Sequence, residues 1–179
     1  QFGAVRNIAG DNSWTNAGTG LSLGAVDLKT TNGGTDGTVR NFWIASDSGT
    51  LDIVGQLAGS NAGTIAVQGN TINKTGLGTI RYSGAEANLI NGQTTIQAGT
   101  LELNKSVGVN ALVGTVVVGD GGGGAGAETL RWIANDQIPV ITVIVAPSGT
   151  LDLNGRTDTI GSLTLQRIKN LAPTITTTG

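Results

Sequence analysis

The sequence contains no cysteine, histidine or methionine among its 179 residues. The absence of cysteine excludes a disulfide framework and thiolate metal sites. Aromatic residues make up 3% of the chain, which argues against extensive stacking platforms for bases or sugars. No apolar run approaches the length of about 18 residues that a transmembrane helix needs, so we expect no membrane span in this chain.

Charged residues are also scarce. They make up 12% of the chain, roughly half of the usual share, and the formal net charge is −2. The ten lysine and arginine residues are scattered and form no cluster. The sequence therefore gives no electrostatic basis for binding nucleic acid.

Glycine, in contrast, is abundant, with 30 residues in the chain. Glycine and threonine are poor helix formers, so this composition favours an extended β architecture with many tight turns. Apolar residues reach 38% and alternate with polar ones, as at Leu101 and Leu103. This hydrophobicity, together with the low net charge, excludes disorder for most of the chain.

A glycine turn followed by an alternating strand recurs along the sequence. Three close copies lie 50 residues apart, at residues 48–53, 98–103 and 148–153, and looser copies occupy residues 62–67, 77–82 and 113–118. Such recurrence is typical of a β-solenoid, in which each coil covers the next. The predicted fold class is all-β, and at about 20 to 25 residues per coil the chain forms roughly seven to nine rungs.

The repeated phrase also predicts the direction of its side chains. Glycine allows the positive φ of the turn, and the leucine or isoleucine two residues later points inward to stack on its equivalent in the next rung. The acidic residue that follows, which is Asp52, Glu102 or Asp152, then points outward. A slip of one residue would turn every leucine to solvent, so the register is well specified.

We expect one solenoid domain over residues 1–179. Residues 1–20 form either the first rung or an N-terminal cap, residues 119–126 form a glycine-rich surface loop, and residues 170–179 form an extended tail. Residues 127–137 are ambiguous, because residues 128–133 could open a short helix or form a strand; the strand is favoured because the neighbouring segments are strands and Pro139 follows closely. The window from Val140 to Val145 has the highest β propensity, as a buried strand or, alternatively, an adhesive edge.

No set of residues predicts catalysis. Asp52, Glu102 and Asp152 could form a ladder of carboxylates on one face, as a polysaccharide-cleaving β-helix would need, but solvated outward positions are the favoured interpretation. The pair Arg131 and Asp136 has the same status. We therefore predict no catalytic residues, no cofactor-binding residues and no metal ligands.

Two further features have a structural and a functional interpretation. The run from Asp120 to Gly124 is glycine-rich, but it lacks the repeated Gly-Gly-x-Gly-x-Asp phrase of calcium-binding repeats and the Gly-Lys-Ser/Thr of a phosphate loop. Trp14, Trp43 and Trp132 could mark a carbohydrate platform, although core plugs or cap anchors are favoured because the three lie far apart in sequence.

Two segments together resemble a known family. Residues 73–84 (NKTGLGTIRYSG) and 90–103 (INGQTTIQAGTLEL) are similar to the two halves of the autotransporter-associated β-strand repeat of bacterial surface proteins. Residues 104–165 resemble the extended form of this repeat, and residues 20–68 match it loosely. The chain departs from the pattern at residues 87–89, where the family has a different turn.

The resemblance implies a right-handed parallel β-helix exported to the surface or exterior of a Gram-negative-type bacterium. The family has no shared active site, so we expect a structural protein and no enzyme: a stalk, an adhesin passenger or a self-assembling fibre subunit. The alternative is a carbohydrate-active or carbohydrate-binding β-helix. The expected partner is a second copy stacked end to end, or the continuation of a longer passenger, since the chain starts at Gln1 and is processed, excised or incomplete. A surface glycan is a further candidate partner.

Overall fold

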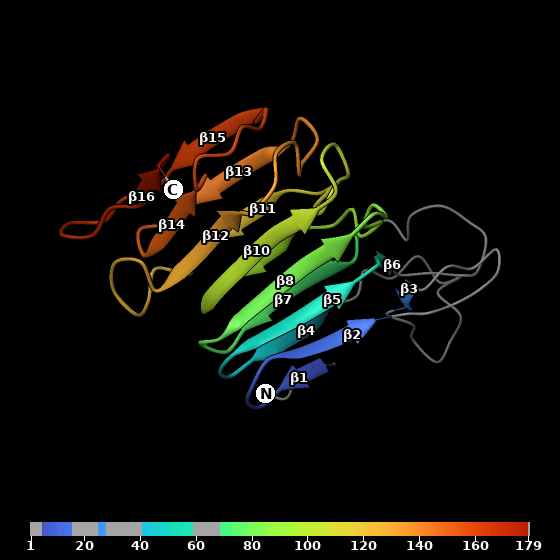
Figure 1. The fold of residues 1–179 in the computed structure, drawn as a ribbon. Helices are drawn as coiled ribbons and strands as arrows, with labels where there is room; N and C mark the ends of the chain where they lie inside the picture. Colours follow the sequence, from blue (N-terminus) through green and yellow to red (C-terminus); the bar gives the residue numbers. More distant parts are fainter. Residues whose placement is uncertain (1–4, 16–24, 28–40, 59–68, 179) are drawn as a thin grey trace.

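The computed structural model describes residues 5–15, 25–27, 41–58 and 69–178. All regular secondary structure in these residues is strand, and every pairing between the named strands is parallel (Figure 1). The described residues contain no helix. The prediction of an all-β chain is therefore confirmed.

Most of the strands belong to two sheets of seven strands each. In spatial order, the first sheet contains β1 (Val5–Asn7), β4 (Asn41–Ser46), β7 (Thr71–Thr75), β9 (Thr94–Ile96), β11 (Val116–Val118), β13 (Thr142–Val145) and β15 (Ser162–Leu165). The second sheet contains β2 (Asn12–Thr15), β5 (Thr50–Val54), β8 (Thr79–Gly84), β10 (Gly99–Lys105), β12 (Glu128–Trp132), β14 (Gly149–Asp152) and β16 (Thr174–Thr176). A short third sheet pairs β3 (Ala25–Asp27) with β6 (Gln56–Ala58).

The chain alternates between the two large sheets and advances by one strand in each as it goes. This order is consistent with a β-solenoid. In the second sheet, Leu51, Ile80, Leu101, Leu130 and Leu151 are successive partners, 29, 21, 29 and 21 residues apart. The close copies of the repeated phrase thus lie two strands apart, because each 50-residue period contains a long and a short coil.

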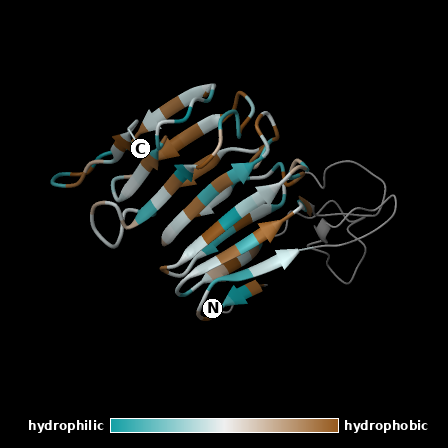
Figure 2. Ribbon diagram, in the orientation of Figure 1, coloured by the Kyte–Doolittle hydropathy of each residue, from teal (hydrophilic) through white to brown (hydrophobic). Residues whose placement is uncertain are grey.

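The core consists of side-chain columns that run across the strands. Leu101 and Leu130 are completely buried, and Ile80 and Leu151 lie directly beside them. Hydrophobic and hydrophilic residues alternate along the strands (Figure 2). Burial alternates in the same way, as in β5, where Leu51 and Ile53 are the buried residues. The predicted inward direction of these residues is confirmed, and the segment whose sequence is ambiguous between helix and strand contains the strand Glu128–Trp132.

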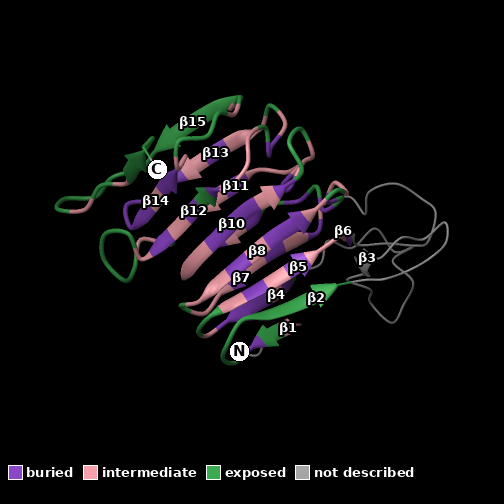
Figure 3. Cartoon of the chain, viewed as in Figure 1, coloured by how far each residue is buried: buried purple, intermediate pink, exposed green. Residues whose placement is uncertain are grey.

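The last strands are exposed although their sequences carry the same alternation. Leu163 and Leu165 of β15 are 44% and 51% exposed, and Ile175 of β16 is 39% exposed. These residues continue the inner columns, since Leu165 pairs with Val145 and Ile175 with Leu151. Figure 3 shows β15, β16 and β2 as exposed strands on either side of buried ones. The core columns therefore end at the surface.

The glycine turns pack directly against the coil before them. Gly99 has a φ of +64°, and a Cβ atom placed there would lie 2.5 Å from the carbonyl oxygen of Gly78. Gly49 has a φ of +68°, and its Cβ would lie 2.3 Å from the oxygen of Gly10. Glycine is needed at these turns for its backbone conformation and for the close approach of neighbouring coils.

Several predicted segments can be placed in this fold. Residues 5–15 supply the first strand of each large sheet, residues 119–126 form a loop without regular structure, and the tail includes β16. In the window from Val140 to Val145, Val143 and Val145 are buried, whereas Val140 is 71% exposed. The repeat copy at 62–67 lies outside the described residues.

Candidate functional site

The three predicted acidic positions lie in register on one face of the second sheet. Asp52 pairs with Arg81, Arg81 with Glu102, Glu102 with Arg131 and Arg131 with Asp152. We call these five residues the charge ladder. Acidic and basic side chains alternate along it, so each carboxylate lies two strands from the next.

The arginines of the ladder are bound to its carboxylates. Arg81 lies 2.7 Å from Glu102, and Arg131 lies 2.7 Å from Asp152, in each case measured from a guanidinium nitrogen to a carboxylate oxygen. The carboxylate of Asp52 accepts a hydrogen bond of 2.6 Å from the hydroxyl group of Ser83. The outward direction of the acidic residues is confirmed, but the expectation that they are solvated is wrong for Glu102 and Asp152, whose side chains are only 11% and 10% exposed. Their arginine neighbours cover them.

The sequence makes Arg131 and Asp136 together a candidate catalytic combination. The ion-pair partner of Arg131 is Asp152, because the β12–β14 register places these two side chains opposite each other. Burial alone would raise the pKa of Asp152, but hydrogen bonds from Arg131, Thr176 and the Asn154 amide outweigh it and lower the pKa below its usual value. A carboxylate held in this form is a poor proton donor at neutral pH.

A buried lysine lies in the core of the first sheet. Lys74 pairs with Ile44 on one side and Ile96 on the other, and it is completely buried. Its ammonium group donates hydrogen bonds of 2.6 Å to the carbonyl oxygens of Gly76, Gly78 and Ala98. Burial lowers the pKa of Lys74 to about 8. The ammonium group is thus still protonated at neutral pH and ties two successive turns together.

Lys105, at the end of β10, is a second buried lysine. Its ammonium group donates to the carbonyl oxygen of Ser83 at 2.8 Å and to that of Gly55. Burial lowers the pKa of Lys105 to about 8, although the negative charges of Glu86 and Asp52 act in the opposite direction. Like Lys74, it links backbone carbonyls from more than one coil.

Buried amide side chains also link the backbones of neighbouring coils. The Asn88 side chain accepts a hydrogen bond from the Leu57 amide at 2.7 Å and donates one to the Ala111 carbonyl oxygen at 2.8 Å. Asn88 lies in the stretch where the chain departs from the family pattern. Its side chain fixes the turn by bonding to the coils on both sides.

Gln137 is the corresponding link further along the stack, because its side chain bonds to both the backbone amide and the carbonyl group of Lys105. Sequence reasoning missed Lys74, Lys105, Asn88 and Gln137 as structural links. For the two lysines the one available signal was their polar type at strand positions where the alternation predicts an inward side chain, whereas Asn88 and Gln137 lie outside the strands.

The tryptophans do not share a surface. Trp132 is completely buried, and its indole nitrogen donates to the carboxylate of Asp158 at 2.8 Å. Trp14 is 42% exposed on β2, whereas Trp43 lies on β4 in the other sheet. This arrangement assigns Trp132 to the core and brings no two tryptophans together as a platform.

In the residues that the structure describes, no group of three or more His, Cys, Asp or Glu side chains is arranged to hold a metal ion. No helix in the same residues is long and apolar enough to cross a membrane. Comparison with protein-family models, curated proteins and solved structures finds no match for the chain.

Proposed function

We propose that the chain is a right-handed parallel β-helix whose role is structural: a rigid extracellular stalk, passenger segment or fibre subunit of a bacterial surface protein. The observation that carries this proposal is the continuity of the columns across the strands of both large sheets. Stacked apolar columns, bound turn carbonyls and a charge ladder all resist bending or separation of neighbouring coils. The resemblance to the autotransporter-associated repeat supports the extracellular location.

The polar groups of the described residues support a structural role over a catalytic one. The carboxylates of Glu102 and Asp152 are occupied by arginines, and the buried lysines bind backbone carbonyls. A polysaccharide-cleaving β-helix needs carboxylates and cations that are free to act on a substrate. Incubation with acidic polysaccharides tests this directly, since unsaturated products would contradict the structural proposal.

The exposed end of the stack is the proposed assembly face, and its occupant is a second copy of this chain. The face consists of Leu163, Leu165 and Ile175, which continue the core columns and lie on strands with an unpaired edge. At the opposite end, Val5 heads the column that passes through Ile44 and ends at Leu165. A second copy stacked in register would cover the apolar residues and pair the free edge.

Sedimentation velocity over a wide range of protein concentration tests this assembly. We expect linear assemblies that lengthen with concentration in the native chain and are lost in Leu165→Lys. The matched control is Val140→Lys, which adds the same charge at an exposed residue outside the strands. A folded native chain that stays monomeric at every protein concentration would contradict self-assembly. The proposed occupant of the exposed face would then be a further rung of a longer chain.

A further inference from the structure

Glu128 occupies a position at which its neighbours are glycine. It is the first residue of β12, and its partners are Gly99 in β10 and Gly149 in β14. At Gly149, a Cβ atom would lie 2.2 Å from the carbonyl oxygen of Val118. The glycine-rich loop of residues 119–126 lies just before this strand.

The side chain of Glu128 is buried, and its carboxylate has only part of its hydrogen-bonding capacity satisfied. The residue is 2% exposed, and its Oε2 atom is the one buried side-chain nitrogen or oxygen of the described residues that has no hydrogen-bond partner. Leaving a buried carboxylate oxygen without a partner is costly, more so than for a neutral group. Such an oxygen indicates a bonding partner that the protein itself does not supply.

The glycine-rich loop covers this carboxylate. A Cβ atom at Gly123 would lie 3.8 Å from the Oε1 atom of Glu128, so the carboxylate faces the loop. The loop is fastened to the buried Ser148, whose hydroxyl oxygen accepts a hydrogen bond of 3.1 Å from the Gly121 amide. A second bond of 2.8 Å joins the Gly126 amide to the Ser148 carbonyl oxygen.

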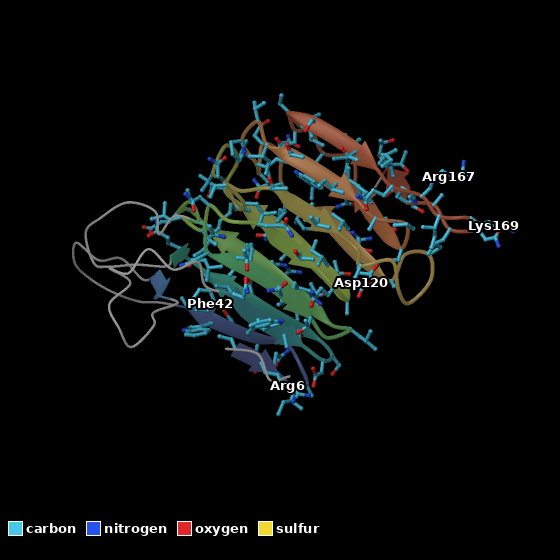
Figure 4. The ribbon with its side chains drawn as sticks, turned by 180° about the vertical axis from the view of Figure 1, so that it is seen from behind. Arg6, Phe42, Asp120, Arg167 and Lys169 are labelled. Carbon is cyan, nitrogen blue, oxygen red and sulfur yellow. The ribbon has the colours of Figure 1, made fainter. Side chains whose placement is uncertain are left out.

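Asp120, at the start of the loop, brings a second negative charge. Its carboxylate accepts a hydrogen bond of 2.7 Å from the Gly122 amide, and the residue is exposed. Figure 4 labels Asp120 where the loop meets the stack. Burial raises the pKa of Glu128, hydrogen bonding from Ser148 opposes this, and the charge of Asp120 raises the pKa further. Two carboxylates near each other repel unless a cation or a proton lies between them.

We propose that Glu128 and Asp120 bind a calcium ion beneath the glycine-rich loop. The ion satisfies the free Oε2 atom of Glu128 and neutralises the repulsion between the two carboxylates. Calcium accepts six to eight oxygen ligands in flexible geometry, so the hydroxyl group of Ser148, the loop carbonyls and water are suitable additional ligands. Magnesium demands a stricter octahedral arrangement. With only two carboxylates, we expect weak affinity, with a Kd of about 10⁻⁴–10⁻³ M, the range of extracellular calcium modules.

The test is calorimetric titration of the intact 179-residue chain with calcium, together with thermal unfolding in calcium, in magnesium and in EDTA. We expect heat of binding and a higher Tm with calcium, because a ligand that binds only the folded state stabilises it. Glu128→Gln and Asp120→Asn each abolish both effects. The matched control is Asp136→Asn, which removes the same charge at an exposed residue whose φ of +53° suits asparagine.

A proton on Glu128 is the competing occupant, and pH separates the two. If only a proton is held, the folded state binds more protons than the unfolded state, and stability falls as pH rises through the raised pKa. Calcium removes this fall in the native chain but not in Asp120→Asn. Glu128→Gln, if folded, is at least as stable as the native chain in EDTA and less stable in calcium. Absence of calcium binding to the native chain, or binding that survives in both variants, overturns the proposal. If Glu128→Gln fails to fold, Asp120→Asn on the exposed loop still decides the test.

Discussion

The middle of the stack and its last rung contain the same residue types in very different surroundings. Leu101 and Leu130 have a strand on each side and are completely buried, whereas Leu163 and Leu165 have a strand on one side and are 44% and 51% exposed. All four occupy alternating positions of a strand. The comparison shows that burial in this fold depends on the neighbouring coil rather than on the strand that carries the residue. Stability therefore accumulates by contact between neighbours.

The largest expected contrast is between Leu101→Ala and Leu165→Ala. The first leaves a cavity between two covered strands and lowers the free energy of unfolding by about 2–5 kcal/mol. The second removes a half-exposed side chain and costs less than about 1 kcal/mol when the chain is monomeric. Urea unfolding monitored by circular dichroism measures both. Equal losses in a monomeric preparation would contradict the comparison, and a cost for Leu165→Ala that grows with protein concentration would support the assembly face.

The glycines offer a second contrast of this kind, between Gly99→Ala and Gly108→Ala. Both residues have positive φ, 64° and 77°, and both variants bear the left-handed backbone cost of about 1–2 kcal/mol. Only Gly99 lies against another coil, and its new Cβ must displace the Gly78 carbonyl; nothing lies within 4 Å at Gly108. Overpacking adds about 1–3 kcal/mol at Gly99. A loss at Gly108 as large as that at Gly99 would show that coil contact is irrelevant to the turn.

The columns could be predicted from the sequence, because an inward leucine two residues after a glycine turn is a local pattern. The complete set of strands that contribute to each column could not be predicted. Leu130 was missed as a member of the repeat, since Glu128 stands where the phrase has glycine. The charge ladder was missed because the close copies show only its acidic residues. Arg81 belongs to the looser copy at residues 77–82, and Arg131 belongs to the coil that was not recognised as a copy.

Buried polar residues were beyond sequence reasoning for a different reason. A lysine in an alternating strand is normally a surface residue, and only the three-dimensional arrangement of turns shows that Lys74 has three carbonyl acceptors. The ends of the stack present the reverse case, where Leu165 has a core pattern but no covering coil. Local pattern specifies the direction of a side chain, whereas its environment is set by residues about 20 to 30 positions away.

A third, smaller contrast uses Lys74 in the middle and the exposed Lys169 near the end (Figure 4). Lys74→Met leaves three turn carbonyls without their donor but also removes a buried charge, and we expect a net loss of about 1–3 kcal/mol at neutral pH. Lys169→Met changes stability little. The same urea titrations measure both, and equal effects would contradict a linking role for Lys74.

The pH dependence of the native chain sharpens this contrast. The pKa of Lys74 is about 8 in the folded chain and has an ordinary value of 10.5. Between these values the unfolded state binds more protons than the folded state, so the free energy of unfolding rises with pH from about 8 to 10.5. Below about 8, Lys74 is charged in both states and its burial lowers the free energy of unfolding in full. Lys105 contributes a similar rise. We expect Lys74→Met to flatten part of the rise and Lys169→Met to leave it unchanged; an equally steep rise in Lys74→Met would contradict the assignment.

The smallest expected contrast concerns the outer surface, where Arg81 belongs to the charge ladder and Arg167 projects near the end of the stack (Figure 4). Arg81→Gln leaves the nearly buried carboxylate of Glu102 without its ion-pair partner, 2.7 Å away in the native chain. Because Arg81 is itself about one-third exposed, the loss is limited to roughly 1 kcal/mol at low salt and shrinks as salt screens the pair. Arg167→Gln, at an exposed residue, is expected to be neutral. Unfolding titrations at low and high salt measure both variants. A salt-independent loss in Arg81→Gln would assign the effect to packing of the arginine stem over the sheet instead of to its charge, and the ladder would then act as a cover for the strands beneath it.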